Sequence, residues 1–334
     1  MERSEITFFI IYNPAAGKGA LKKQLPKIKK LCEDYGIEAL CYGTKAGGDA
    51  YRAAIRLAKK YGVLHTGEEF MVSQQLHKYY IISAGGDGTL NETVRGVLDS
   101  GYDIPIGILP SGSTNDFGYS LGITGDFLSN TAAMAEAAVK GKVYKCDVSS
   151  MDGKYYAYTS SFGLFSDVSY ATPRKLKNIF GHAAYIMYGA LNLPKTRKIP
   201  VTVEYDGASF KADLLLGMIV NAKSVGGFRG ITGKNVRLDD GYNEMFIVIW
   251  PKGIKGLIKT LIQAVGLKRG SEKALREAEN MKDLSGIKIV RIKDASFAFE
   301  KEVPFSIDGE YGDMHDLTTF TVSGKRIGYL TGNV

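Results

Sequence analysis

A strand-like run, a glycine-rich turn and a helical pattern follow one another between Tyr79 and Leu98. Residues Tyr79–Ala84 are mostly apolar and bounded by glycine, which predicts a short buried strand. From Thr89 onward the apolar residues recur at helical spacing. Because the turn Gly85–Gly88 lacks bulky side chains, its backbone N–H groups can approach an anion, and the helix start adds partial positive charge. The stretch therefore predicts an anion site.

Asp87 is the unexpected residue of this turn, because a carboxylate repels phosphate unless a divalent cation lies between them. A magnesium ion carried by a nucleotide would remove that conflict. The alternative is a glycine-rich turn in which Asp87 only caps the helix. The turn alone leaves both interpretations open.

Strand-like and helical segments alternate through the first part of the chain. Strands are expected at Ile6–Tyr12, Ile37–Tyr42, Tyr79–Ala84 and Ile104–Leu109, and helices at Ala20–Tyr35, Gly48–Tyr61 and Phe127–Lys140. Such alternation predicts a doubly wound α/β domain, in which ligands bind at the carboxyl ends of parallel strands. The loops Asn13–Gly19 and Pro110–Phe117, and the residue Thr44, follow other strands of this set.

After Lys142 the pattern changes to short period-2 runs, which predict an antiparallel β-sandwich. The expected strands are Val143–Ser150, Tyr155–Ser161, Val201–Tyr205, Leu214–Val220, Glu244–Trp250, Ile287–Ile292 and Ser296–Glu300. Helical patterns lie at Asn178–Asn192 and Gly253–Leu267.

The loops resemble, in order, the motifs of the diacylglycerol kinase catalytic family, the bacterial lipid kinases related to sphingosine and ceramide kinases. The similar motifs are Asn13–Lys18, Gly85–Glu92, Gly112–Phe117, Arg237–Tyr242 and Asp308–Glu310. Ser113 stands where the family usually has threonine, which retains a hydroxyl. The resemblance spans nearly the whole chain. It implies a first domain similar to NAD kinase and phosphofructokinase, of residues 1–142 completed by 317–334, and a lipid-substrate domain of residues 143–316.

The resemblance implies that ATP and Mg²⁺ bind at the first domain's loops. The implied nucleotide-binding residues are Asn13, Pro14, Ala15, Ala16, Gly17, Lys18, Thr44, Gly85, Gly86, Asp87, Gly88, Thr89, Leu90, Asn91, Ser113, Asn115 and Asp116.

Phosphoryl transfer to an alcohol needs a positioned hydroxyl and an acceptor for its proton, and carboxylates serve both purposes. The resemblance implies Glu310 as the general base, Asp308 as an orienting residue or alternate base, and Asp87 as a third candidate. The alternative for Asp308-Gly309-Glu310 is a surface turn.

The resemblance also implies a structural magnesium ion bound by the carboxylate of Asp240 and the backbone carbonyls of Arg237 and Tyr242. Oxygen ligands of this kind suit a hard cation. The alternative is a simple Asp-Gly hairpin turn. Upstream, Phe228 replaces a glycine of the family pattern, a departure that concerns the lipid side.

The chain of 334 residues carries 43 Lys and Arg against 35 Asp and Glu, a net charge of +8. This basic excess suits an anionic membrane or a phosphorylated substrate. No nucleic-acid-binding signature occurs, so no nucleic-acid partner is expected. Three widely spaced cysteines fit a reducing cytoplasm. We expect a cytoplasmic protein in peripheral contact with the inner face of an anionic membrane, and a homodimer is left open.

The segment Pro251–Arg269 predicts an amphipathic helix with two interpretations. Its apolar face can pack on the second domain's sheet. Alternatively, the lysines Lys252, Lys255 and Lys259 can lie against lipid headgroups. A second basic patch, Arg174, Lys175 and Lys177, precedes the helix expected around Tyr185.

Together these features favour an ATP- and Mg²⁺-dependent lipid kinase that phosphorylates the hydroxyl of a membrane lipid such as diacylglycerol. The acceptor stays open among diacylglycerol, a sphingoid base, ceramide, phosphatidylglycerol and an undecaprenyl-type alcohol. The alternatives are an NAD kinase, which would share the Gly85–Thr89 loop, and a non-catalytic regulator that binds nucleotide or lipid on the same fold.

Overall fold

The structure is a computed structural model that describes residues 6–64, 78–112, 114–164, 197–232 and 236–332. It divides into two compact units. The first comprises residues 1–146 and 325–334, and the second comprises residues 147–324. The helix expected at Asn178–Asn192 and the basic patch before it lie outside the described residues.

A parallel sheet forms the centre of the first unit, as predicted. Its strand order is β2-β1-β4-β6-β17, and the last strand is the returning C-terminal end of the chain. The strands are β1 (Ile6–Tyr12), β2 (Ile37–Gly43), β4 (Tyr79–Gly85), β6 (Ile106–Pro110) and the end of β17 (Glu310–Leu330).

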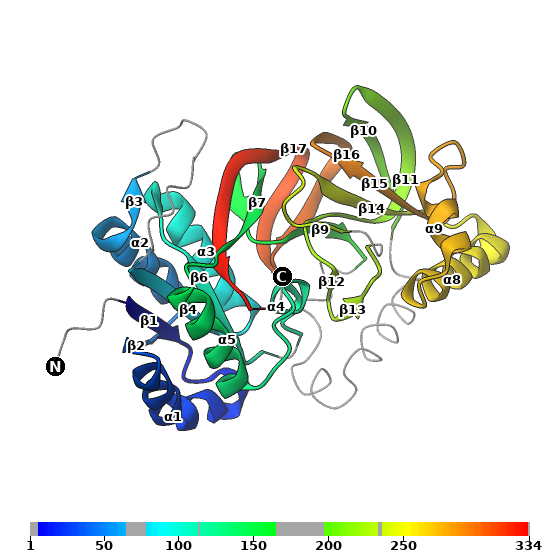
Figure 1. The fold of residues 1–334 in the computed structure, drawn as a ribbon. Helices are drawn as coiled ribbons and strands as arrows, with labels where there is room; N and C mark the ends of the chain where they lie inside the picture. Colours follow the sequence, from blue (N-terminus) through cyan, green and yellow to red (C-terminus); the bar gives the residue numbers. More distant parts are fainter. Residues whose placement is uncertain (1–5, 65–77, 113, 165–196, 233–235, 333–334) are drawn as a thin grey trace. The chain divides into compact units, whose positions relative to one another are not determined.

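Helices cover both faces of this sheet (Figure 1). One face carries α1 (Ala20–Asp34) and α5 (Phe127–Val139), and the other carries α2 (Asp49–Tyr61) and α3 (Asp87–Ser100). Because both faces are covered, the central strands are buried along nearly their whole length. Short elements complete the unit: η1 (Ala16–Gly19), β3 (Val63–Leu64), β5 (Tyr102–Asp103) and α4 (Asp116–Ser120).

The second unit is β-rich, with antiparallel pairs along the order β15-β14-β11-β10-β16-β17. Two strands lie between β11 and β16: β10 pairs with the first half of each, and β9 pairs with the second half. The strands are β7 (Tyr144–Met151), β8 (Lys154–Tyr156), β9 (Thr159–Gly163), β10 (Ile199–Tyr205), β11 (Ala208–Val220), β12 (Ser224–Val225), β13 (Phe228–Arg229), β14 (Asn243–Ile249), β15 (Ile287–Ile292), β16 (Asp294–Ile307) and β17.

A cluster of aromatic rings fills the core of this unit. Phe162 lies with its ring centroid 5.5 Å from that of Phe297, 5.0 Å from Phe299 and 5.1 Å from Phe305. All four side chains are more than nine-tenths buried. The offset and edge-to-face arrangements of these rings stabilise the core beyond the area that they bury.

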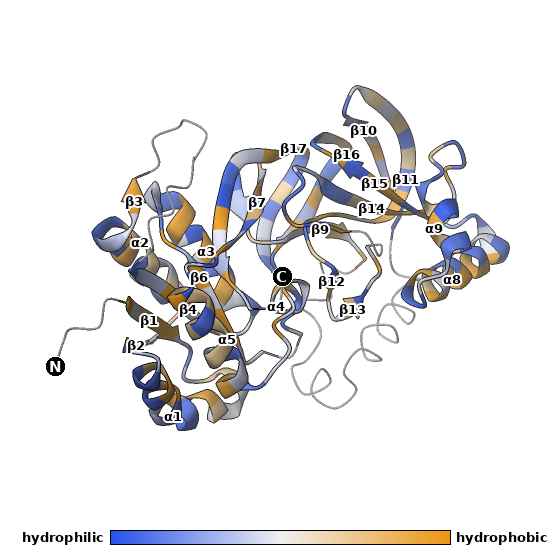
Figure 2. Ribbon diagram, viewed as in Figure 1, coloured by the Kyte–Doolittle hydropathy of each residue, from blue (hydrophilic) through white to orange (hydrophobic). Residues whose placement is uncertain are grey.

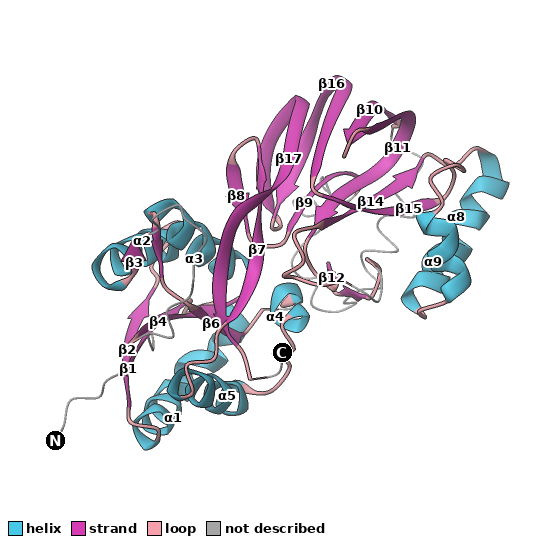
Figure 3. Ribbon diagram, turned by 45° about the horizontal axis from the view of Figure 1, so that its top comes forward, coloured by secondary structure: helices cyan, strands magenta, loops and turns pink. Residues whose placement is uncertain are grey.

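Two helices, α8 (Gly253–Lys268) and α9 (Glu272–Glu279), pack on each other and on β15 (Figure 3). The interpretation that α8 packs its apolar face on the sheet is wrong, because that face is exposed. Thr260, Gln263 and Leu267 are the buried residues of this helix. Among the described residues, no helix has the length and apolar character needed to span a membrane.

Candidate active site

Three loops meet at the carboxyl edge of the first unit's parallel sheet. The Asn13 N–H donates to the carbonyl of Ala84 at 3.0 Å, and the Ser111 N–H donates to the carbonyl of Gly85 at 2.8 Å. Glycine makes this approach possible, since a Cβ atom at Gly17 would lie 2.9 Å from the Ser111 carbonyl oxygen. The sequence predicted these loops at one sheet edge, and the structure brings them into contact.

The turn after β4 leads directly into α3. The helix begins at Asp87, and the preceding Gly86, its N-cap residue, is extended and has no side chain that could cap the helix. Helix N-terminal N–H groups without a capping partner are suited to an anion. A side chain at Gly112 would come within 2.8 Å of the Cα of Gly86, so the second and third loops also depend on glycine. The interpretation of Asp87 as the N-cap is therefore wrong; it is the first residue of the helix.

The carboxylate of Asp87 fastens the second loop to the third. Its Oδ2 accepts a hydrogen bond from Thr114 Oγ1 at 2.8 Å. Burial raises the pKa of Asp87 to about 6; the hydrogen bond from Thr114 opposes this, and the nearby charge of Asp116 adds to it. Thr114 was not among the predicted site residues, although it lies inside a motif that carried the resemblance.

Asn115 holds the third loop in shape from a left-handed backbone position with φ of 50°. Its Oδ1 accepts from the Gly112 N–H at 2.8 Å, and its Nδ2 donates to the Gly112 carbonyl at 2.9 Å. Asp116, the first residue of α4, is buried. Ser113 lies outside the described residues.

The first loop has a fold of its own. Asn13 Oδ1 accepts from the Ala15 N–H at 2.9 Å, and the Ala16 N–H donates to the Asn13 carbonyl at 3.2 Å. Gly17 has a positive φ of 55°. Pro14 lies in this turn, and only the backbone of Lys18 is described, within η1.

A side chain of α3 fixes the loop that follows β2. Glu92 accepts from the Gly48 N–H at 2.8 Å and from the Ala50 N–H at 3.1 Å. Next to this loop, the Thr44 N–H donates to the Tyr12 carbonyl at 2.9 Å. Glu92 was part of the recognised motif but was not assigned a role, and nothing in the sequence marked its partners.

Residues 89–91 of α3 are buried, but not all of their polar atoms have hydrogen-bond partners in the described part of the chain. Leu90 and Thr89 are buried in the unit, and a side chain at Gly85 would collide with Thr89. Asn91 Oδ1 and Ser111 Oγ are buried without a hydrogen-bond partner among the described residues. Buried polar atoms of this kind require a partner, and a bound ligand or water can supply it.

The second unit contains Asp308, in the tight turn between β16 and β17, and Glu310, the first residue of β17. Asp308 and Gly309 both have positive φ, 49° and 84°, which is the type I′ hairpin geometry. Asp308 is only 2% exposed, and its carboxylate accepts from the N–H groups of Ala157, Tyr158 and Thr159 at 2.7, 3.0 and 3.0 Å. Glu310 is exposed. The two acids are therefore in opposite environments.

The turn at Asp240 is held by protein groups. Asp240 Oδ1 accepts from the Tyr242 N–H at 3.1 Å, and Oδ2 lies 2.5 Å from the guanidinium of Arg291. The neighbouring Glu244 is buried, and burial, together with the charge of Asp240, raises its pKa to about 8. Within the described ranges, no group of three or more His, Cys, Asp or Glu side chains is arranged to hold a metal ion.

Arg237 and Tyr242 also have side-chain partners. Arg237 Nε lies 3.3 Å from Asp239 Oδ1, and the Arg291 guanidinium stacks 4.4 Å from the centroid of the Tyr242 ring. The turn precedes β14 and is braced by Asp147, whose carboxylate accepts from the Gly241 N–H at 2.5 Å. The carboxylate of Asp240, the side-chain ligand that the resemblance implies, already pairs with the Arg291 cation, so as arranged it does not fit a bound metal ion.

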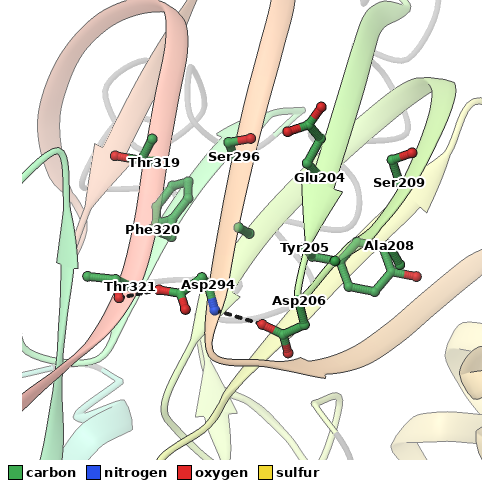
Figure 4. Close-up of a pocket in the computed structure, with 12 residues that line it drawn as sticks. Glu204, Tyr205, Asp206, Ala208, Ser209, Asp294, Ser296, Thr319, Phe320 and Thr321 are labelled. Carbon is green, nitrogen blue, oxygen red and sulfur yellow. Dashed lines mark hydrogen bonds between the residues drawn. The ribbon is translucent and has the colours of Figure 1, made fainter.

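A surface hollow of about 490 Å³ lies beside the β10–β11 hairpin of the second unit (Figure 4). Its acids repel phosphate, and two of them are engaged: Asp206 accepts from the Asp294 N–H at 3.0 Å, and Asp294 accepts from Thr321. The hollow therefore offers no phosphate chemistry.

Comparison with known proteins identifies the family. Residues 7–151 match the diacylglycerol kinase catalytic domain. A diacylglycerol kinase of Staphylococcus carnosus (strain TM300) is 32% identical over 304 residues, covering 91% of this chain and 88% of that protein.

Solved structures share the fold over both units. A diacylglycerol kinase from Bacillus anthracis str. Sterne gives a TM-score of 0.65 at 20% identity, covering 98% of this chain and 97% of that chain. An NAD kinase from Archaeoglobus fulgidus in complex with ATP gives a TM-score of 0.52 at 11% identity, covering 98% and 94%. The predicted fold class, an NAD kinase-like α/β domain with a β-rich domain, is confirmed. By its sequence relatives, the chain belongs to the diacylglycerol kinase family, a family of lipid kinases.

Proposed function

We propose that the protein transfers a phosphoryl group from ATP, which brings Mg²⁺, to the hydroxyl of a membrane lipid such as diacylglycerol. The observation that carries this proposal is the meeting of three glycine-bearing loops beside the uncapped start of α3. The residues present suit a nucleotide phosphate, because the glycines leave room for close approach and the helix start offers N–H donors. The buried atoms Asn91 Oδ1 and Ser111 Oγ, which have no hydrogen-bond partner among the described residues, add polar groups that a ligand could contact.

In this proposal the first unit holds the phosphates and the second unit supplies groups for the acceptor. When bound with ATP, Mg²⁺ neutralises the charge that develops on the phosphates. The Asp87 carboxylate would hold the Mg²⁺ ion beside the helix start. The ion would then lie between the negative charges of Asp87 and of the phosphates. Lys18, in the first loop, is proposed to add a cation to the phosphates, as the resemblance implies.

We assign Glu310 as the general base that takes the proton from the acceptor's hydroxyl, because its side chain is exposed. Asp308 is assigned a positioning role, because three backbone N–H groups occupy its carboxylate. Those hydrogen bonds fix the Ala157–Thr159 segment against the hairpin turn, and the same turn orients Glu310. No step is assigned to a metal ion at Asp240, whose carboxylate pairs with Arg291.

The rival function is NAD phosphorylation, which the fold alone would allow, since an NAD kinase shares it. A non-catalytic regulator is disfavoured, because the acids Asp87, Asp308 and Glu310 are all present. We propose that the reaction takes place at the cytoplasmic face of the membrane, where ATP is available.

A labelled-ATP assay separates these functions. The protein is given γ-labelled ATP with a total lipid extract, with purified diacylglycerol or with NAD, and the labelled product is identified. We expect phosphatidic acid from diacylglycerol, no labelled NADP, and no product from Asp87→Asn. Label on NAD, or on no acceptor at all, would refute the proposed function. Label on another extract lipid would correct the acceptor and keep the lipid kinase.

A further inference from the structure

Helix α8 turns its apolar side outward. At 3.6 residues per turn, its five exposed large aliphatic side chains fall in one stripe about 100° wide. Their exposed fractions are 78% for Ile254, 50% for Ile258, 55% for Leu261, 68% for Ile262 and 50% for Val265. Figure 2 shows hydrophobic residues along this helix. A contiguous exposed apolar stripe on a helix indicates a surface that another apolar phase covers.

The opposite side of α8 is anchored to the second unit by a polar residue. Gln263 is buried, its Nε2 donates to the Ile287 carbonyl at 2.9 Å, and its Oε1 accepts from the Ile287 N–H at 2.8 Å. These bonds fix the start of β15 to the helix. Gly266 allows α9 to pack closely, since a Cβ there would lie 2.8 Å from the Cβ of Ala274. The outward direction of the apolar stripe is therefore fixed by the inward side, because the helix cannot rotate without breaking these contacts.

Basic residues accompany the stripe, and no acid occurs between Pro251 and Ser271. Lys252, Lys255, Lys268 and Arg269 are exposed, and none of them forms an ion pair with an acid in the described part of the chain. Lys259, which the sequence placed with the headgroup-facing lysines, is instead paired with Asp283 at 2.9 Å.

The chemistry of this surface distinguishes a membrane from a protein partner. Protein interfaces are enriched in aromatic residues and depleted in lysine, whereas this stripe is purely aliphatic and is flanked by lysines. An aliphatic stripe with basic flanks is the pattern of a helix that lies in the headgroup region of an anionic bilayer. The complementary charge therefore favours lipid.

We propose that α8 is a membrane-docking helix, which inserts the aliphatic stripe into the headgroup–acyl boundary of an anionic bilayer and sets its basic flanks against lipid phosphates. The choice of a membrane as occupant rests in part on the proposed function, whose acceptor lies in a bilayer. Docking through α8 would bring the second unit to that bilayer without a membrane-spanning helix.

The test is vesicle co-sedimentation without ATP or diacylglycerol, so that binding is measured apart from catalysis. Ile254→Ser with Ile262→Ser should weaken binding to phosphatidylglycerol-containing phosphatidylcholine vesicles about tenfold or more. Lys252→Glu with Lys255→Glu and Lys268→Glu should weaken it about a hundredfold, and salt should weaken wild-type binding. Lys259 is left intact because its ion pair belongs to the fold.

Matched controls carry the same chemistry elsewhere. Leu64→Ser with Leu317→Ser changes two side chains that are 55% and 58% exposed, and Lys22→Glu with Lys23→Glu and Lys27→Glu changes the net charge equally on exposed residues of α1. Both controls should retain binding close to wild type. Thermal melts verify that each variant is folded, and turnover on diacylglycerol in detergent micelles should stay near wild type in the α8 variants.

Equal vesicle binding by wild type and both α8 variants would overturn the docking role. So would a serine double variant that binds vesicles normally but changes a dimer into a monomer in analytical ultracentrifugation, since the stripe would then join two copies. A wild-type protein that binds vesicles through α8 but phosphorylates no lipid in micelles would instead refute the proposed function and leave the docking surface in place.

Discussion

Asp87→Asn removes one charge from the turn between β4 and α3 and keeps the size of the side chain. Burial raises the pKa of Asp87 to about 6 from an ordinary 3.8. Between those pH values the folded chain holds the proton more tightly than the unfolded chain does. The contribution of Asp87 to wild-type stability therefore falls as the pH rises from 3.8 to about 6 and stays at the lower level above it.

The magnitude follows from the same two values. One pKa unit corresponds to about 1.4 kcal/mol, so the ionised carboxylate costs the folded state about 3 kcal/mol above pH 6. Asparagine carries no such charge and still accepts a hydrogen bond from Thr114 through Oδ1. The backbone N–H groups of Asn115 and Asp116 also face the Asp87 carboxylate. Replacing that charged acceptor by a neutral amide weakens these hydrogen bonds, which costs about 1 kcal/mol. We therefore expect Asp87→Asn to raise the free energy of unfolding by about 2 kcal/mol at pH 8.

Urea unfolding of both proteins between pH 4.5 and 8 measures this difference. The gain in Asp87→Asn should shrink as the pH falls, because wild-type Asp87 becomes protonated in the folded chain. Kinase turnover should be lost, and the kcat/KM of wild type should rise with pH through about 6 as Asp87 ionises in the free enzyme.

A control residue on the same unit, Asp126, has a pKa shift in the opposite direction. Asp126 caps α5 by accepting from the Ser129 N–H at 2.8 Å, which lowers its pKa, so Asp126→Asn should not stabilise the chain. A less stable Asp87→Asn at pH 8, or a difference that does not change with pH, would refute the account of Asp87 as a partly buried, destabilising charge. Near-normal turnover would refute its role at the phosphates.

Four further substitutions and one treatment with EDTA test the other acids of the chain. Asp308→Ala should lower the free energy of unfolding by about 3 kcal/mol in urea titrations, because three buried N–H groups lose their acceptor. Glu310→Ala, in contrast, should leave the melting temperature unchanged and reduce turnover about a hundredfold. Glu92→Ala should cost about 2 kcal/mol by freeing two N–H groups at the start of α2, and Glu92→Gln should cost less. EDTA should leave the melting temperature of the nucleotide-free protein unchanged, because Asp240 pairs with Arg291. A fall of several degrees would instead support a structural metal ion at Asp240.

The first unit was the more predictable of the two from sequence. Its strands are buried on both faces, so they appear as continuous apolar runs, and its helices alternate with them. The predicted strand Ile6–Tyr12 coincides with β1, and the predicted helix Phe127–Lys140 ends one residue later than α5. The glycine pattern and the order of the elements were enough to predict that the three glycine-bearing loops lie at one edge of the sheet.

The second unit depends on contacts between residues far apart in the chain, which spacing does not reveal. The strand β17 runs over 21 residues, yet its first half mixes polar and apolar residues without period-2 alternation, so it gave no strand signal. Helix α8 was predicted correctly as an element, but amphipathicity alone cannot say which face a helix buries. That orientation depends on Gln263 and Gly266, whose partners lie on β15 and α9.

The Asp-Gly dipeptides show most clearly why local sequence could not assign the site. At Asp308-Gly309 both residues have positive φ and the carboxylate is buried under backbone donors. At Asp240-Gly241 the carboxylate pairs with Arg291, and at Asp87-Gly88 the dipeptide starts a helix. The backbone conformation of each dipeptide follows from the elements that flank it. Asp308-Gly309 joins two paired strands, Asp240-Gly241 precedes a single strand, and Asp87-Gly88 follows a strand and begins a helix. The charge follows from burial, which only the fold decides. Burial and donors differ among these three aspartates, and Asp87 is the one that lies at the three glycine-bearing loops, where its pKa is raised.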